Sequence, residues 1–270
     1  MSRAFTLSAL LSLGLTAAAL YVTRPPPPPR PWQPVAPGVQ AALLSITGGV
    51  GAQAVRIDLR EASVWVVDAR DESGAGRLVS TAMRERIPGA VAAVNGGFFD
   101  AEGQPMGLVI AEGRETNSLR RADWGVLWIA EASAGVLHTR QWRAKAPEGV
   151  VGALQAGPRL VVSRRPVGLK VQEARRTVAC VRARHELILL VTEAIEANAL
   201  ATWLARPVAH GGLGCADALN LDGGPSSQLS LHSEGLSLEV EGGWPVPNGL
   251  VVVPKGPPPQ EAPAAGPQPY

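Results

Sequence analysis

The segment Asn220-Leu221-Asp222-Gly223-Gly224-Pro225-Ser226-Ser227 lies between a short apolar run, 216–219, and an alternating run, 228–232, which the sequence predicts to be strands. Its adjacent glycines allow backbone conformations with φ > 0 and let a ligand approach bare N–H groups. An Asp-Gly pair alone is a common hairpin signal, but a hairpin needs two turn residues and this segment has six. We therefore interpret it as a binding or catalytic site at the end of a buried strand.

A second apolar run, 92–94, ends in a similar corner. Asn95, Gly96 and Gly97 follow it, and then Phe98, Phe99 and Asp100. The two glycine-containing corners are candidates for opposite walls of one pocket, although sequence spacing does not establish this.

With both corners in view, the chain resembles the phosphodiester glycosidase family over about residues 40–254. The shared motifs occur in family order: Asn95 to Asp100 (Asn-Gly-Gly-Phe-Phe-Asp), Pro105 to Gly113, Gly157 to Val161, Arg176 to Ala179, Asn220 to Ser227, and Pro245 to Val252. Each motif is weak alone, but the ordered set is specific. The chain departs from the family at Pro225, which stands where the family has a third glycine.

The resemblance implies hydrolysis of the C1–O bond of a sugar 1-phosphodiester, similar to a GlcNAc 1-phosphodiester, releasing free sugar and a phosphomonoester. An oxocarbenium-like charge develops at C1 in such reactions, so a carboxylate is needed beside it. We assign this role to Asp222. Asp100 either completes a catalytic pair or caps the turn after Phe99. The resemblance implies no cofactor.

The substrate-binding candidates come from the same motifs. Amide side chains suit sugar hydroxyls because they both donate and accept hydrogen bonds. Arg176 presents a rigid fork for a phosphate, unless it forms a surface salt bridge, and glycine N–H groups can line an anion site. The full set is Asn95, Gly96, Gly97, Arg176, Asn220, Gly223, Gly224, Ser226, Ser227 and Asn248.

Two other functions compete with this interpretation. The chain could be a non-catalytic module that binds envelope glycans. It could also be a serine hydrolase that uses Ser226 or Ser227, but Gln228 replaces the second glycine of a nucleophile elbow.

Composition excludes several classes of partner and cofactor. Lys and Arg number 25 against 23 Asp and Glu, for a formal net charge of +2, and no basic block suggests a nucleic-acid groove. The four histidines and two cysteines show no metal-ligand spacing, so no metal is expected. Cys180 and Cys215 either form one disulfide or remain two buried thiols.

Four regions are expected along the chain. Residues 1–23 predict a signal peptide or N-terminal membrane anchor, and 24–37 a proline-rich linker. Residues 38–255 form the phosphodiester glycosidase-like domain, and 256–270 a disordered Pro/Ala-rich tail. The domain would therefore be extracytoplasmic, acting on a sugar-phosphate or envelope glycan and meeting the membrane only through its N-terminal segment.

The expected fold is α+β, a single β-rich domain of mixed sheets with a few packing helices. The patterns 54–59 and 63–68 suggest a hairpin, and 78–87 and 193–206 suggest helices. The tryptophans Trp65, Trp124, Trp128 and Trp142 are expected mainly in the core, although one exposed tryptophan would suit a glycan.

Overall fold

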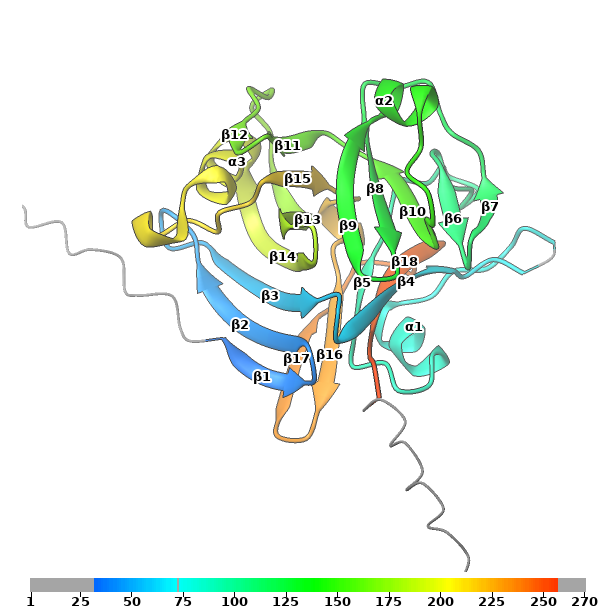
Figure 1. The fold of residues 1–270 in the computed structure, drawn as a ribbon, viewed down its shortest axis with the longest axis horizontal. Helices are drawn as coiled ribbons and strands as arrows, with labels where there is room; N and C mark the ends of the chain where they lie inside the picture. Colours follow the sequence, from blue (N-terminus) through cyan, green and yellow to red (C-terminus); the bar gives the residue numbers. More distant parts are fainter. Residues whose placement is uncertain (1–31, 72, 257–270) are drawn as a thin grey trace, which may run out of the picture.

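The computed structural model describes residues 32–71 and 73–256. Three antiparallel β-sheets dominate this part of the chain (Figure 1). The largest sheet has eight strands, in the order β1 (Gln33–Ala36), β2 (Val39–Ser45), β3 (Gly51–Asp58), β14 (Glu186–Glu196), β13 (Glu173–Ala183), β15 (Asp217–Asn220), β11 (Arg159–Val162) and β12 (Arg165–Pro166).

The other two sheets have five strands each. One has the order β7 (Arg114–Asn117), β6 (Val109–Ala111), β10 (Gly152–Ala156), β8 (Gly125–Ala130) and β9 (Ser133–His138). The other has the order β17 (Leu236–Val240), β16 (Leu229–Ser233), β5 (Ala92–Asn95), β18 (Asn248–Pro254) and β4 (Ala62–Asp68).

Helices are few and short. They are α1 (Ser80–Arg86), α2 (Thr139–Ala144) and α3 (Ala197–Ala205), with 3₁₀ turns η1 (Val208–His210) and η2 (Gly224–Ser226). The expectation of a β-rich domain with a few packing helices is confirmed in outline, but the domain is mostly β rather than α+β, and the pairings of its named strands are antiparallel rather than mixed. The helix expected from residue 193 begins only at Ala197, because Glu196 caps it by accepting hydrogen bonds from the N–H groups of Asn198 and Ala199.

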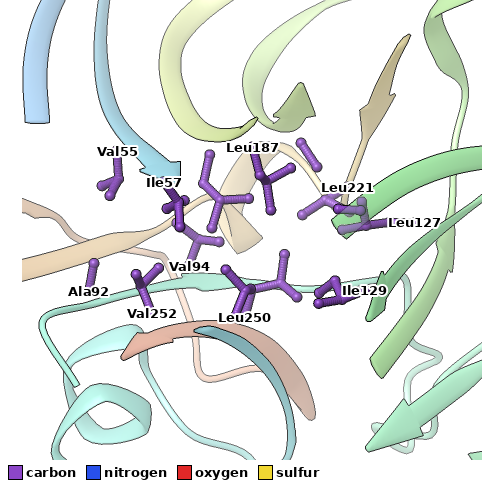
Figure 2. Packing of buried hydrophobic residues seen from close by; sticks show 14 of the residues in the cluster. Val55, Ile57, Ala92, Val94, Leu127, Ile129, Leu187, Leu221, Leu250 and Val252 are labelled. Atoms are coloured by element: carbon purple, nitrogen blue, oxygen red, sulfur yellow. The ribbon is translucent and has the colours of Figure 1, made fainter. Parts of the chain in front are cut away.

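The central strands β13 and β14 are buried on both faces, which explains their long apolar runs. One face joins a core shared by all three sheets (Figure 2). The other face packs on α3, where Leu200, Trp203 and Leu204 cover Val178 and Ile188. Burying both faces fixes the register of β13, since a shift of one residue would exchange the two sets of side chains.

The structure differs from expectation in one strand pairing and at one domain boundary. The runs 54–59 and 63–68 do not form a hairpin, because β3 pairs with β2 and β14 while β4 crosses to another sheet and pairs with β18. Residues Gln33–Ala36, expected in the linker, form edge strand β1, where Pro34 is tolerated.

The expected signal or anchor, the proline run and the C-terminal tail beyond Gly256 lie outside the described residues. Within the described residues, no helix has the length and apolar character needed to span a bilayer.

Candidate active site

The two glycine-containing corners meet in the structure, although their strands belong to different sheets. The N–H of Asp222 donates to the carbonyl of Gly96 at 2.9 Å, and Nδ2 of Asn95 donates to the carbonyl of Asp222 at 2.8 Å. The end of β5 is thus joined directly to the segment that follows β15.

Asn95 holds this junction together. Its side chain is fully buried, and Oδ1 accepts from Oγ1 of Thr177 at 2.7 Å and from the N–H of Gln228 at 3.1 Å. An amide oxygen has two lone pairs, so both are used inside the protein. Asn95 therefore connects three segments, and its oxygen is not free to accept from a sugar hydroxyl as expected.

Asp222 is half-buried at the centre of the junction. Its Oδ1 accepts from the N–H of Gly223 at 2.9 Å, and Ser226 lies in the turn that follows. Burial raises the pKa of Asp222 above the usual aspartate value, and the hydrogen bonds from Ser226 and Gly223 oppose this shift. The site thus holds a desolvated carboxylate that two local donors orient.

Arg176 is 5 % exposed. Its Nη2 donates to the carbonyl of Gln172 at 2.7 Å, while Nε has no partner. A Cβ added at Gly223 would lie 4.0 Å from Cδ of Arg176, so the two residues are neighbours. Burial lowers the pKa of Arg176, and the charge of Glu196 opposes this. In the described part of the chain Arg176 makes no salt bridge, so the alternative of a surface ion pair is wrong.

Most of the unpartnered polar atoms belong to residues of the expected site. Among the described residues, five buried side-chain nitrogen or oxygen atoms have no hydrogen-bond partner, and four belong to the expected site. These four are Nε of Arg176, Oδ1 of Asn220, Oγ of Ser227 and Nδ2 of Asn248; the fifth is Oε1 of Gln53 on β3. A buried unsatisfied polar group costs about 1–3 kcal/mol, so four of them among the expected site residues call for an explanation.

The strand register places Arg176 and Asn220, which carry two of these atoms, on the same face of the sheet. Val178 on β13 pairs with Asn220 on β15, so Arg176 and Asn220 project from the same face at the end of neighbouring strands. Nδ2 of Asn220 donates to the carbonyls of Gly157 and Leu221, which leaves Oδ1 as its free acceptor.

The glycines serve packing more than anion binding. A Cβ at Gly96 would collide with Oδ1 of Asn248, so only glycine fits. The N–H groups of Gly96 and Gly97 donate to the backbone carbonyl and Oδ1 of Asn248, at 2.9 and 2.7 Å. Because these donors and the N–H of Gly223 are engaged internally, the anion site expected from glycine N–H groups is not formed by them. Gly224 takes the left-handed conformation, with φ of 58°.

Asp100 and Pro225 both have local roles in the structure. Oδ1 of Asp100 accepts from the N–H of Gln104 at 2.7 Å, so this exposed carboxylate caps the turn, which was the alternative to a catalytic pair. Pro225 is exposed in the first turn of η2, where a missing N–H leaves no helical bond unmade.

Sequence reasoning missed Gln228 and Trp244. Oε1 of Gln228 accepts from the N–H of Ser80 at 2.6 Å, and its Nε2 donates to the carbonyls of Ser226 and Trp244. Nε1 of Trp244 donates to Oγ of Ser226 at 3.0 Å. The sequence offered one signal for each: Gln228 directly follows the motif that ends at Ser227, and Trp244 directly precedes the motif that begins at Pro245.

A disulfide joins Cys180 on β13 to Cys215, just before β15. It therefore links the strand that carries Arg176 to the segment that leads into Asp222. Within residues 32–71 and 73–256, no group of three or more His, Cys, Asp or Glu side chains could hold a metal ion.

Several solved structures resemble the fold of this chain. The catalytic domain of zebrafish N-acetylglucosamine-1-phosphodiester alpha-N-acetylglucosaminidase, auto-inhibited by its pro-peptide, aligns with a TM-score of 0.58 and 17% identity over 83% of this chain and 85% of that one. A Burkholderia pseudomallei protein whose name describes it as exported aligns with a TM-score of 0.54 and 15% sequence identity, over 77% of this chain and 75% of that one. A hypothetical protein from Synechocystis aligns with a TM-score of 0.50 and 17% sequence identity, over 83% of this chain and 64% of that one.

At these identities the structural matches establish a shared fold. No curated protein sequence matches the chain significantly. The sequence pattern of the phosphodiester glycosidases matches residues 88–253, a span that contains both corners, Arg176 and Asn248. The chain belongs to the phosphodiester glycosidase family.

Proposed function

We propose that this protein is an exported glycosidase that hydrolyses the C1–O bond of a sugar 1-phosphodiester. Water adds to C1, the C1–O bond breaks, and its electron pair leaves with the phosphomonoester. This leaving group is a stabilised anion, so the greater demand for assistance lies at the sugar, where positive charge develops. Asp222 is the carboxylate that we assign to that charge.

The observation that carries the proposal is the set of four buried, unpartnered side-chain atoms that belong to the two motif segments, Arg176 and Asn248. Nε of Arg176 and Nδ2 of Asn248 are donors, and Oδ1 of Asn220 is an acceptor. Oγ of Ser227 can be either. Donors suit phosphate oxygens and acceptors suit sugar hydroxyls, so a substrate carrying both groups would satisfy the set.

Arg176 suits the phosphate in particular. It is buried without a carboxylate partner, and its Nε and remaining N–H groups form a planar fork. A phosphate would supply the hydrogen-bonded anion that Arg176 lacks, since the charge of Glu196 acts on its pKa but forms no salt bridge with it. Export is supported by the disulfide and by the exported relative, since disulfides persist in oxidising compartments.

Hydrolysis in oxygen-18 water tests the reaction. Purified protein should release free sugar from a GlcNAc 1-phosphodiester, with the label in the sugar and none in the phosphomonoester. Label in the phosphate would instead identify a phosphodiesterase acting at phosphorus.

Two other outcomes distinguish the competing functions. Binding of the substrate without turnover would favour the glycan-binding module, whose supporting observation is that Asp100 caps a turn and leaves a single carboxylate at the junction. The serine hydrolase has little support, because Oγ of Ser226 accepts from Nε1 of Trp244 rather than bonding to a histidine. A serine-reactive fluorophosphonate should therefore leave activity unchanged.

A further inference from the structure

Trp244 combines an exposed ring with a fixed polar edge. Its side chain is 46% exposed, yet Nε1 donates to Oγ of Ser226 at 3.0 Å. Its backbone carbonyl also accepts from Nε2 of Gln228 at 3.2 Å. The indole is therefore anchored at its N–H while much of its surface remains in contact with solvent.

The neighbouring backbone holds Trp244 against the catalytic segment. The N–H of Gly243 donates to the carbonyl of Pro225 at 2.7 Å, and Arg175 donates to the carbonyls of both Glu241 and Ser227. The segment that carries the indole is thus fastened to η2 at two points. A side chain ordered before binding loses little conformational entropy when a ligand arrives.

The N–H edge of Trp244 lies against Ser226, in the same short segment as Asp222. Oγ of Ser226 accepts the indole hydrogen, and the Ser226 side chain lowers the pKa of Asp222. The indole therefore lies close to the segment that carries the proposed catalytic carboxylate.

We propose that Trp244 forms the sugar subsite of this centre, with the apolar face of a pyranose ring lying against its exposed indole and C1 next to Asp222. Through Ser226 the same residue is a positioning residue for the carboxylate. This inference rests on the proposed function and adds the residue that recognises the sugar. The amphipathic indole suits both parts, since its face is apolar and its edge donates a hydrogen bond.

Three variants separate the two contributions. Trp244→Phe keeps an aromatic face and removes the N–H, whereas Trp244→Ala removes both. Trp65→Ala is the matched control, because Trp65 is 45% exposed and lies on edge strand β4, away from both corners. Both tryptophans are exposed, so the variants should fold, and thermal melting checks this.

The expected results differ for each variant. With a GlcNAc 1-phosphodiester, Trp244→Ala should raise KM about tenfold or more, whereas Trp244→Phe should change it by less than about threefold. Both should move the acid limb of the kcat/KM profile to higher pH, because a weaker bond from Ser226 lets the pKa of Asp222 rise further. Trp65→Ala should change neither quantity.

Binding of the same phosphodiester, followed by intrinsic tryptophan fluorescence and calorimetry, gives a readout without turnover. Wild-type binding that Trp244→Ala abolishes supports the subsite even if no hydrolysis occurs, and that result would refute only the proposed reaction. Equal KM and binding in Trp244→Ala and wild type would overturn the subsite, as would equal losses in Trp65→Ala. A wild-type protein that neither binds nor hydrolyses this probe would overturn both proposals.

Discussion

Replacing Asp222 by asparagine tests the proposed reaction most directly. The change keeps the shape of the side chain and removes its charge. The new amide oxygen can still accept the N–H of Gly223, which lies 2.9 Å from the carboxylate in the wild type.

The loss of rate should far exceed any loss of stability. If the carboxylate stabilises charge at C1, kcat should fall at least about 100-fold, equivalent to about 2.7 kcal/mol of transition-state stabilisation. Because burial raises the pKa of Asp222, the folded protein holds this proton more tightly than the unfolded chain. Ionising Asp222 therefore reduces stability as pH rises from the ordinary aspartate value through the raised one.

The same linkage sets the expected melting behaviour. The Asp222→Asn side chain carries no charge at any pH, so the variant should melt at or above the wild-type temperature at neutral pH. This relative advantage should disappear below the ordinary aspartate pKa. The wild-type kcat/KM profile should lose activity as Asp222 becomes protonated, at a pH above the usual aspartate range.

Release of sugar from a GlcNAc 1-phosphodiester is the assay, with Asp100→Asn as the matched control. The control also converts a carboxylate to an amide, but it keeps the oxygen that caps an exposed turn. It should retain activity within about threefold, which corresponds to less than about 1 kcal/mol. Full activity in Asp222→Asn would place the reaction elsewhere, and equal losses in both variants would restore Asp100 to a catalytic pair.

Four other substitutions have definite expected outcomes. Arg176→Ala should raise KM for a phosphodiester roughly 10- to 100-fold but hardly for a neutral glycoside, and Arg176→Lys should rescue only partly; equal losses on both substrates would make Arg176 structural. Replacing Cys180 and Cys215, 35 residues apart, by alanine should cost about 4 kcal/mol of unfolding free energy in denaturant titrations; an unchanged midpoint would contradict this. Gly96→Ala should cost at least about 2 kcal/mol, because its Cβ meets Asn248, and normal melting would refute the packing argument. Pro225→Gly should leave kcat within about twofold, since its position needs no N–H, and a large gain would show that the proline impairs the site.

Much of this fold follows from the sequence itself. The β-branched and apolar runs around 187–192 and 177–182 form the central strands, because both faces of such a strand must be covered. The helix at 78–87 was correctly predicted, since Pro88 and Gly89 stop it. The Asn-Gly-Gly and Asp-Gly-Gly corners were recognisable as a candidate site, because each follows an apolar strand and the second has more polar and glycine residues than a hairpin turn needs.

Hydrogen-bond assignments within the site depended on the tertiary structure. Asn95 and Asn220 have the same side chain and similar sequence surroundings, yet Oδ1 of Asn95 is satisfied and Oδ1 of Asn220 is free. The difference arises from Thr177 and Gln228, which lie 82 and 133 residues from Asn95 along the chain.

Non-local pairing also set the surroundings of Trp244, whose Nε1 donates to Oγ of Ser226. A sequence shows which atoms a residue can offer, and here it identified the carboxylates, amides and guanidinium that the site contains. Which of those atoms remain available depends on neighbours that only folding brings together. Folding therefore leaves Nε of Arg176 without a partner, whereas the oxygen of Asn95 and the N–H groups of Gly96 and Gly97 are used to build the junction.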